Sequence, residues 1–223
     1  MTREKHGRDL NQWKPVPGGK GAGKIRIIGG RFRGHQLEYS GDLRTRPMKD
    51  NIREALFNLV GGFVEGKLAI DLFAGTGAIG LEALSRGAAA AILVERHLPT
   101  ARIIQRNVDS LGSDLSVQID SADSYFWVRQ FLKQPPSQAR LPWAVFCSPP
   151  YNHFVNHKAD LLASIENLMK AAPPDSLLVV ESDDRFSPAE LPDPEAWRIR
   201  HYAPATLSVW RNARSTQSDF QTS

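Results

Sequence analysis

One segment of this chain, AIDLFAGTGAIGLEAL, constrains the fold more than any other. In it an apolar run is followed at once by Gly75, Gly77 and Gly80, which have the G-x-G-x-x-G spacing, and then by a helical pattern. Glycines at this spacing allow a tight strand-to-helix turn whose backbone can approach a ligand closely. The segment therefore predicts a strand, a ligand-binding loop and a helix within an α/β sheet.

The same alternation of strand and helix patterns continues through the rest of the chain. Buried or alternating runs predict strands over 67–73, 90–95, 116–120, 143–148 and 175–182, and a pair of strands over 197–211. Helical spacing predicts helices over 77–87, 98–112, 124–132 and 157–171, with a loop over 133–142. Alternating strands and helices favour a doubly wound, mostly parallel sheet, and the last two strands fit an antiparallel edge.

The first quarter of the chain differs from this pattern. Residues 1–24 have the composition of a flexible basic arm, and 25–62 predict a small β-hairpin (25–39) followed by a helix (48–61). We expect the main domain over 63–211 and a polar tail over 212–223. Residues 1–50 hold 12 of the 28 lysines and arginines but only 5 of the 24 acidic residues. This asymmetry favours a polyanionic partner, whose phosphates would meet hairpin side chains: Arg26, Arg31, Arg33 and His35.

Composition excludes several classes of protein. A single cysteine, Cys147, excludes a disulfide framework and a multi-cysteine zinc site, and no ligand cluster predicts any other metal. No apolar run of about 18 residues occurs, so we expect no membrane span. The first residues lack the apolar core of a secretion signal, and we expect a cytoplasmic protein.

Acidic residues at the strand ends distinguish between two kinds of cofactor. Glu95 follows the second strand, 20 residues after Gly75, where it can accept hydrogen bonds from ribose hydroxyls. Asp71 ends the first strand, where its charge would repel a pyrophosphate and attract an ammonium or a sulfonium. S-adenosylmethionine carries both cations and no phosphate, so this pattern favours it over NAD. After the third strand, Asp123 or Asp120 can accept from an adenine amino group, and Asp123 also fits a helix N-cap.

The fourth strand ends at Ser148-Pro149-Pro150-Tyr151. Two prolines make a rigid turn that can present the Ser148 hydroxyl and the Pro149 carbonyl as hydrogen-bond acceptors. Such acceptors favour attack by the exocyclic amino nitrogen of a base, which must become pyramidal and lose a proton. Tyr151 offers a flat face for stacking the base. The histidines that follow, His153 and His157, are expected on a solvated loop.

The ordered motifs of residues 25–182 resemble the bacterial 16S ribosomal RNA guanine-N2 methyltransferases of type D. The stretches that carry the resemblance are RIIGGRFRGHQL, RPMKDNIREALFNLV, DLFAGTGAIGLEALSRGA, VER and SPPY. The resemblance implies a class I, Rossmann-like methyltransferase with a seven-stranded sheet, helices on both faces and a small N-terminal hairpin and helix extension. It implies methylation of one guanine in the small ribosomal subunit or its assembly intermediate, with S-adenosylmethionine as the methyl donor. We expect the protein to act as a monomer.

The resemblance also implies roles for individual residues. The catalytic tetrapeptide corresponds to Ser148, Pro149, Pro150 and Tyr151. The cofactor-binding residues correspond to Asp71, Phe73, Gly75, Thr76, Gly77, Glu95, Arg96, Asp123 and Arg46. The stretch from Arg46 to Glu54 corresponds to a segment that lies over the cofactor, although Arg53 and Glu54 also fit a surface helix.

Two departures from the family pattern leave alternatives open. The family usually has Asp or Asn where this chain has Ser148, and Thr where it has Met48. Serine at the first catalytic position also occurs in some DNA amino-methyltransferases, so cytosine-N4 or adenine-N6 methylation of DNA is an alternative. A ribosome-assembly factor that binds the cofactor without catalysis is another. An NAD-linked oxidoreductase fits the glycine spacing, but Asp71 and the lack of a hydride-transfer constellation argue against it.

Overall fold

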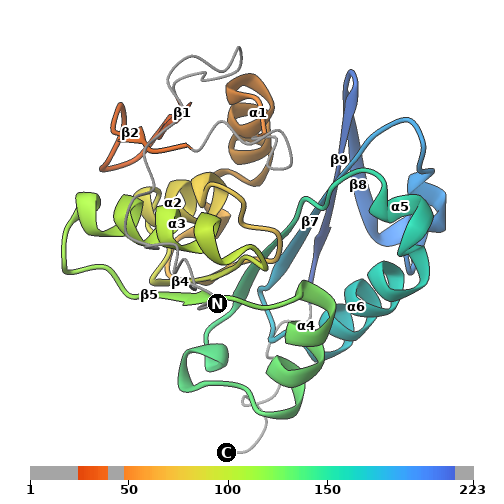
Figure 1. The fold of residues 1–223 in the computed structure, drawn as a ribbon. Coiled ribbons are helices and arrows are strands. Elements are labelled where there is room, and N and C mark those ends of the chain that lie inside the picture. Colours follow the sequence, from red (N-terminus) through yellow and green to blue (C-terminus); the bar gives the residue numbers. More distant parts are fainter. Residues whose placement is uncertain (1–24, 40–47, 214–223) are drawn as a thin grey trace, which may run out of the picture.

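The computed structural model describes residues 25–39 and 48–213, whose main element is a sheet between two layers of helices (Figure 1). Its seven strands lie in the order β5-β4-β3-β6-β7-β9-β8. They are β3 (Leu68–Asp71), β4 (Ala90–Val94), β5 (Val117–Asp120), β6 (Trp143–Cys147), β7 (Leu177–Ser182), β8 (Trp197–Tyr202) and β9 (Ala205–Arg211). Strands β3 to β7 are parallel, and the β8–β9 hairpin joins β7 antiparallel at one edge. The predicted fold class is confirmed.

Helices cover both faces of this sheet, as Figure 1 shows. Two separate apolar clusters fill the space between the sheet and the two helix layers. One layer holds α1 (Asp50–Val60), α2 (Ala78–Ser85) and α3 (Leu98–Leu111). The other holds α4 (Ser124–Lys133), α5 (His153–Asn156) and α6 (Lys158–Ala171). Because β3, β4 and β6 are covered on both sides, they are buried throughout, and apart from Asp71 their residues are apolar rather than alternating.

The predicted elements differ from the observed ones mainly in the loops. The Pro-Pro-Tyr turn continues directly into α5, because the Pro150 carbonyl accepts a hydrogen bond from the His153 amide at 2.8 Å. His153 is buried there, so the prediction of a solvated loop at that position is wrong. The expected 133–142 loop contains a 3₁₀ turn at Ser137–Arg140. Further 3₁₀ turns lie at Gly61–Val64, Pro188–Glu190 and Pro194–Ala196.

The N-terminal hairpin, β1 (Ile25–Arg26) and β2 (Gln36–Leu37), rests on the end of α2. The Ser85 hydroxyl donates to the Gly29 carbonyl at 2.5 Å and accepts from the Phe32 amide at 2.9 Å, and the Ser85 carbonyl accepts from the Arg31 amide at 2.8 Å. Gly30 has a φ of 75°, and a Cβ added to it would lie 1.8 Å from the Ser85 carbonyl oxygen. The close approach of hairpin and helix therefore requires glycine at this position.

A buried ion network locks the hairpin, α1 and α2 together. The Glu82 carboxylate on α2 is fully buried and accepts from the backbone amides of Ile28 and Gly29, both at 2.7 Å, and from Arg86 Nε at 2.8 Å. The Arg53 guanidinium on α1 is also fully buried, with its Nε 3.9 Å from Glu82 Oε2. Its Nη2 donates to the Arg26 carbonyl at 2.6 Å. Buried charges are tolerated only when paired in this way.

A second link joins the hairpin to the glycine loop through α3. The Asn107 side-chain oxygen accepts from the Glu38 amide at 2.7 Å, and its amide nitrogen donates to the carbonyls of Glu38 and Thr76 at 3.1 and 3.3 Å. One buried side chain therefore fixes the end of the hairpin and the loop after β3 at the same time.

We predict that Glu82→Ala lowers the free energy of unfolding by about 3–5 kcal/mol. The change leaves the amides of Ile28 and Gly29 without their acceptor, and the buried Arg53 guanidinium keeps only Asp50, at 3.0 Å, as a counter-charge among the described residues. Urea unfolding followed by circular dichroism measures this loss. The hairpin should also become more sensitive to limited proteolysis.

The matched control is Glu166→Ala, which removes an exposed helical carboxylate paired with Lys170 four residues away. Such a surface pair contributes about 0.3–0.5 kcal/mol. Equal losses for Glu82→Ala and Glu166→Ala would contradict the structural role assigned to the buried network.

Candidate active site

The two loops that the sequence singled out lie side by side at the carboxyl ends of β3 and β6. These strands are parallel neighbours, with Asp71 paired in register with Phe146. Strand β3 is bonded on its other side to β4, so the order of the chain reverses between β3 and β6. In open α/β sheets, ligands bind in the crevice at such a reversal. The fold therefore brings the predicted cofactor loop to the predicted catalytic turn.

The three glycines of the loop have two different functions. Gly75 and Gly77 have φ angles of 53° and 77°, a left-handed conformation that bends the chain from β3 into α2. Gly80 lies within α2, where an added Cβ would stand 2.1 Å from a methyl group of Leu93 on β4. Two glycines thus shape the loop, and the third allows close packing of helix against sheet.

Glu95 lies against this loop, directly after β4. Its Oε2 accepts from the Gly75 amide at 3.0 Å, and its Oε1 accepts from the His97 amide at 2.7 Å. The carboxylate is partly exposed, and its neighbour Arg96 is exposed. The predicted ribose acid is therefore next to the predicted glycine loop, although 20 residues separate them in the sequence.

Asp71 is buried beneath the same loop. Its Oδ2 accepts from the Gly80 amide at 3.2 Å, and its Oδ1 has no hydrogen-bond partner among the described residues. Burial raises the pKa of Asp71 to about 7, and backbone hydrogen bonds from Gly80 and Phe73 oppose that rise. A carboxylate with an unsatisfied oxygen is stabilised by a nearby cation, so this donor set fits a cationic ligand and not a phosphate. Burial also raises the pKa of the Cys147 thiol, which keeps it protonated within the core.

The acids after β5 contact the protein itself. Asp123 is the N-cap of α4, where its Oδ1 accepts from the amides of Tyr125 and Phe126 at 3.1 and 3.0 Å. Asp120 accepts from the indole nitrogen of Trp127 at 2.6 Å. The N-cap prediction for Asp123 is confirmed, and contact with an adenine amino group stays a prediction.

The turn from Ser148 to Tyr151, the predicted catalytic turn, contacts a carboxylate that the sequence motifs did not reveal. The Ser148 hydroxyl donates to Glu181 Oε2, and the Tyr151 hydroxyl donates to Glu181 Oε1 at 3.0 Å. Glu181 lies near the end of β7, the parallel neighbour of β6, and only 6% of it is exposed. The sequence signal for this contact is an acidic residue at the end of β7. It predicts the contact only when β7 is known to lie beside β6, the strand that leads into Ser148-Pro149-Pro150-Tyr151.

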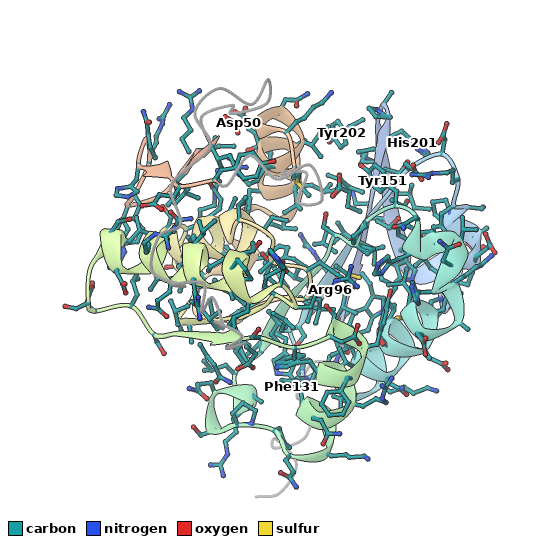
Figure 2. All side chains as sticks on the ribbon, in the orientation of Figure 1. Asp50, Arg96, Phe131, Tyr151, His201 and Tyr202 are labelled. Carbon is teal, nitrogen blue, oxygen red and sulfur yellow. The ribbon has the colours of Figure 1, made fainter. Side chains whose placement is uncertain are left out.

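An aromatic group connects the cofactor loop to the catalytic turn. The Phe73 ring meets the rings of Tyr125 and His153 edge to face, with centroids 5.9 and 5.7 Å apart. The Tyr125 hydroxyl and His153 Nδ1 are 2.7 Å apart and hydrogen-bonded. Burial lowers the pKa of His153, and His157 and Arg96 lower it further. Phe73 therefore packs where the sequence expects a cofactor-binding residue. Figure 2 labels Arg96 near the centre of the view, Tyr151 above it, and His201 and Tyr202 at the tip of the β8–β9 hairpin.

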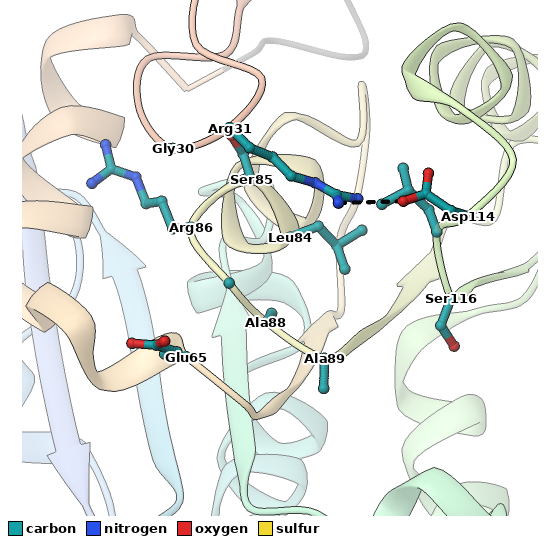
Figure 3. Close-up of a pocket in the computed structure, with 12 residues that line it drawn as sticks. Gly30, Arg31, Glu65, Leu84, Ser85, Arg86, Ala88, Ala89, Asp114 and Ser116 are labelled. Carbon is teal, nitrogen blue, oxygen red and sulfur yellow. Dashed lines mark hydrogen bonds and ion pairs between the residues drawn. The ribbon is translucent and has the colours of Figure 1, made fainter.

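The basic hairpin residues are divided between two regions. Arg26 faces Asp50 of α1 at 3.6 Å, and His35 Nε2 lies 2.9 Å from the Ser110 hydroxyl of α3. Arg31 contacts Asp114 at 3.3 Å at the rim of a hollow of about 550 Å³ (Figure 3). This hollow is lined by residues that precede β4 and β5, so it lies at the edge of the sheet opposite the glycine loop. Arg31 is therefore remote from the catalytic turn, and the hollow is not the cofactor site.

Other predicted residues have varied outcomes. Arg33 is exposed, as a phosphate contact must be. Arg53 is fully buried under the hairpin, so the surface alternative is wrong for it, whereas Glu54 is exposed. Arg46, the 1–24 arm and residues 214–223 lie outside the described residues.

The described parts of the chain contain neither a metal-binding cluster nor a helix that could span a membrane. Residues 25–39 and 48–213 hold no group of three or more His, Cys, Asp or Glu side chains that could bind a metal ion. Over the same ranges, no helix has the length and apolar character needed to cross a bilayer.

Comparison with known proteins gives a consistent result. The sequence model of the family described as conserved hypothetical protein 95 matches residues 25–211. Ribosomal RNA small subunit methyltransferase D of Escherichia coli K12 is 33% identical over 170 residues, which are 75% of this chain and 79% of that protein.

Solved structures share the fold. A putative methyltransferase, yhhF from Escherichia coli, has a TM-score of 0.66 at 28% identity and covers 86% of this chain and all of its own. An RNA methyltransferase from Salinibacter ruber, solved with S-adenosyl-L-homocysteine, has a TM-score of 0.52 at 17% identity, covering 79% of this chain and 100% of its own. With the family match and the 33% identical relative, these likenesses lead to one conclusion: the chain belongs to the family of ribosomal RNA small subunit methyltransferase D.

Proposed function

We propose that this protein is an rRNA methyltransferase that transfers a methyl group from S-adenosylmethionine to the exocyclic N2 amino group of a guanine in 16S rRNA. The observation that carries the proposal is the juxtaposition, across β3 and β6, of a glycine loop with a buried Asp71 and a Ser-Pro-Pro-Tyr turn. A cationic cofactor and an amino acceptor would meet between these two loops. Family membership supports the same reaction.

The cofactor would be held by the residues around the glycine loop. Asp71 supplies negative charge for its cations, Glu95 can accept hydrogen bonds from the ribose, and Phe73 offers an apolar ring beside the site. Bound S-adenosylmethionine supplies an electrophilic methyl group on a sulfonium. The protein has then to orient the acceptor in line with that methyl group, and this positioning is the main source of rate enhancement.

The acceptor base would be held by the catalytic turn. Ser148 and the Pro149 carbonyl can accept hydrogen bonds from the amino group, and the Tyr151 ring can stack on the base after it leaves its helix. The rigid backbone of two consecutive prolines fixes these groups relative to the glycine loop. The substrate would be the small subunit or its assembly intermediate, in the cytoplasm, with the protein acting as a monomer.

An amino-methyltransferase of DNA is the second candidate, and one observation favours it. Ser148 is neutral, whereas the family usually has Asp or Asn at this position. Both candidates use the same chemistry and differ in the polymer that supplies the amino group.

Methyl transfer to rRNA tests both the proposed product and the proposed role of Tyr151. Wild-type protein with labelled S-adenosylmethionine should form N2-methylguanosine at one site in small subunits from a strain that lacks the cognate enzyme. Tyr151→Ala should slow transfer by about 5- to 150-fold, because base stacking contributes about 1–3 kcal/mol. Mass spectrometry maps the product, and Tyr151→Phe, which keeps the ring but loses the hydroxyl bonded to Glu181, separates the effect of stacking from that of this hydrogen bond. Transfer to DNA with none to rRNA would select the second candidate.

The pH dependence of cofactor binding tests the proposed role of Asp71. Because burial raises the pKa of Asp71 to about 7, this carboxyl is mostly protonated at pH 6 and mostly ionised at pH 8. A cation prefers the ionised form, so wild-type affinity for S-adenosylmethionine should rise about tenfold over this range. Calorimetry should show that Asp71→Asn removes this rise.

Dividing wild-type affinities by those of the variant cancels ionisation of the ligand itself. Asp109→Asn, which alters an exposed acid of α3, serves as the control and should retain the wild-type dependence. A ratio that stays constant between pH 6 and 8 would show that Asp71 does not respond to the cofactor.

The basic hairpin is predicted to bind rRNA phosphates through Arg31 and Arg33. Replacing Arg31 and Arg33 together with Glu should weaken binding to small subunits and leave cofactor affinity unchanged. The slope of log affinity against log salt should fall by about 2, roughly 1 for each lost phosphate contact. The control carries the same charge change on α4, in the other helix layer, through Arg129→Glu and Lys133→Glu. Similar effects of the two double variants would mean that net charge, and not the hairpin, governs binding.

A further inference from the structure

The carboxylate of Glu181 joins the two side chains of the catalytic turn that carry hydroxyl groups. Strand β7 pairs with β6 through Val180 and Cys147, which places Glu181 beside Ser148. The Ser148 hydroxyl donates to Oε2, and the Tyr151 hydroxyl donates to Oε1 at 3.0 Å. Only 6% of Glu181 is exposed, so these hydroxyls replace water as its hydrogen-bond donors.

This geometry determines which way the Ser148 hydroxyl points. A hydroxyl has one proton and two lone pairs, and an ionised carboxylate can only accept. When Ser148 donates its proton to Glu181, both lone pairs on Oγ remain for an incoming amino N–H. Without the carboxylate, the hydroxyl could turn its proton toward the amino nitrogen and occupy the lone pair that attacks the methyl group.

The carboxylate also supplies the charge that serine lacks. A neutral hydroxyl is a weak proton acceptor, but a hydroxyl bonded to a carboxylate can accept one proton as it passes its own along. Besides Tyr151, the ionisable group that acts on Glu181 among the described residues is Asp183, and Arg185 lies beside both Asp183 and Tyr151. Arg185 is paired with Asp183 at 2.6 Å, and its guanidinium carbon lies 5.7 Å from the centre of the Tyr151 ring. Burial raises the pKa of Glu181, Asp183 raises it further, and the Ser148 and Tyr151 hydroxyls lower it.

We propose that Glu181 is a positioning residue that orients Ser148 as a hydrogen-bond acceptor and receives, through it, the proton released by the amino group. This inference rests on the proposed function. The amino nitrogen forms a bond to the methyl carbon with its lone pair, and the carbon–sulfur bonding pair returns to sulfur, which becomes neutral. The nitrogen then loses one proton to Ser148 Oγ, the Ser148 proton moves to Glu181 Oε2, and the protonated carboxyl later releases it to water.

The first test is Glu181→Gln, which keeps the size of the side chain but removes its charge. We expect kcat to fall about 100-fold, within the range of roughly 10²–10⁴ for general acid–base catalysis, with KM for the subunit and cofactor affinity unchanged. In the wild type, kcat should fall at acid pH as Glu181 becomes protonated, and this acid limb should be absent from the variant. Glu190→Gln, which alters an exposed acid paired with Lys158, is the matched control. It should keep the wild-type kcat and the fall of kcat at acid pH.

The second test uses charge exchange between the two positions. In the Glu181→Gln background, Ser148→Asp places a carboxylate directly at the acceptor position and should raise kcat at least tenfold. In the wild-type background the same Ser148→Asp change sets two carboxylates against each other and should lower kcat. If Glu181 had only a structural role, Ser148→Asp would change kcat in the same direction in both backgrounds. That result would overturn the proposal.

A third measurement does not depend on turnover and separates this proposal from the proposed function. The carboxyl carbon of Glu181, labelled with ¹³C and titrated by NMR, should show a higher pKa in Ser148→Ala, because a hydrogen bond to the charged form is lost. That result with no methylation of rRNA by the wild type would refute the proposed substrate and uphold the coupling of Glu181 to Ser148. An unchanged titration would overturn the coupling, whatever the substrate.

Discussion

The parallel pairing of β3 with β6 is the constraint on which the site depends. The register sets Asp71 opposite Phe146, so the loops that follow both strands begin at the same level of the sheet. Since successive side chains of a strand point to opposite faces, a slip of one residue would move each side chain into the core on the other face, where its shape does not match its neighbours, and is disfavoured. The apolar cores on the two faces therefore fix the position of the glycine loop relative to the Pro-Pro-Tyr turn.

The layer of α1, α2 and α3 is held in place by buried ion pairs and hydrogen bonds as well as by apolar packing. Glu82 and Arg53 are both fully buried and satisfy backbone groups of the hairpin. Asn107 extends this fixed region to the Thr76 carbonyl in the glycine loop. The hairpin is therefore a packed part of the domain, and its basic side chains project from a rigid base.

Residue patterns predicted the elements well because each helix and strand has a local periodicity and a local stop signal. Gly77 at the start of α2 lies where the sequence predicts the strand-to-helix turn. The sequence could place Asp71, Glu95 and Ser148 at one edge of the sheet because loops after parallel strands share that edge, and their roles stay predictions. Glu181 was missed because a lone acid at a strand end has no motif, and its contact depends on which strand lies beside β6. The remote position of Arg31 was missed because charge alone does not show to which edge a hairpin docks.

The placement of the hairpin has a consequence for the size of a substrate. Arg31 lies near the residues that precede β4, whereas the glycine loop and Ser148 lie beyond the opposite ends of the strands. Strand β4 has five residues and so separates these regions by about 17 Å at roughly 3.3 Å per residue. A ligand that touches both must reach around the sheet, which a free nucleoside is too short to do. Under the proposed function, phosphate contacts at Arg31 and methyl transfer at Ser148 would lie at opposite ends of the strands, a separation that a folded polymer can span.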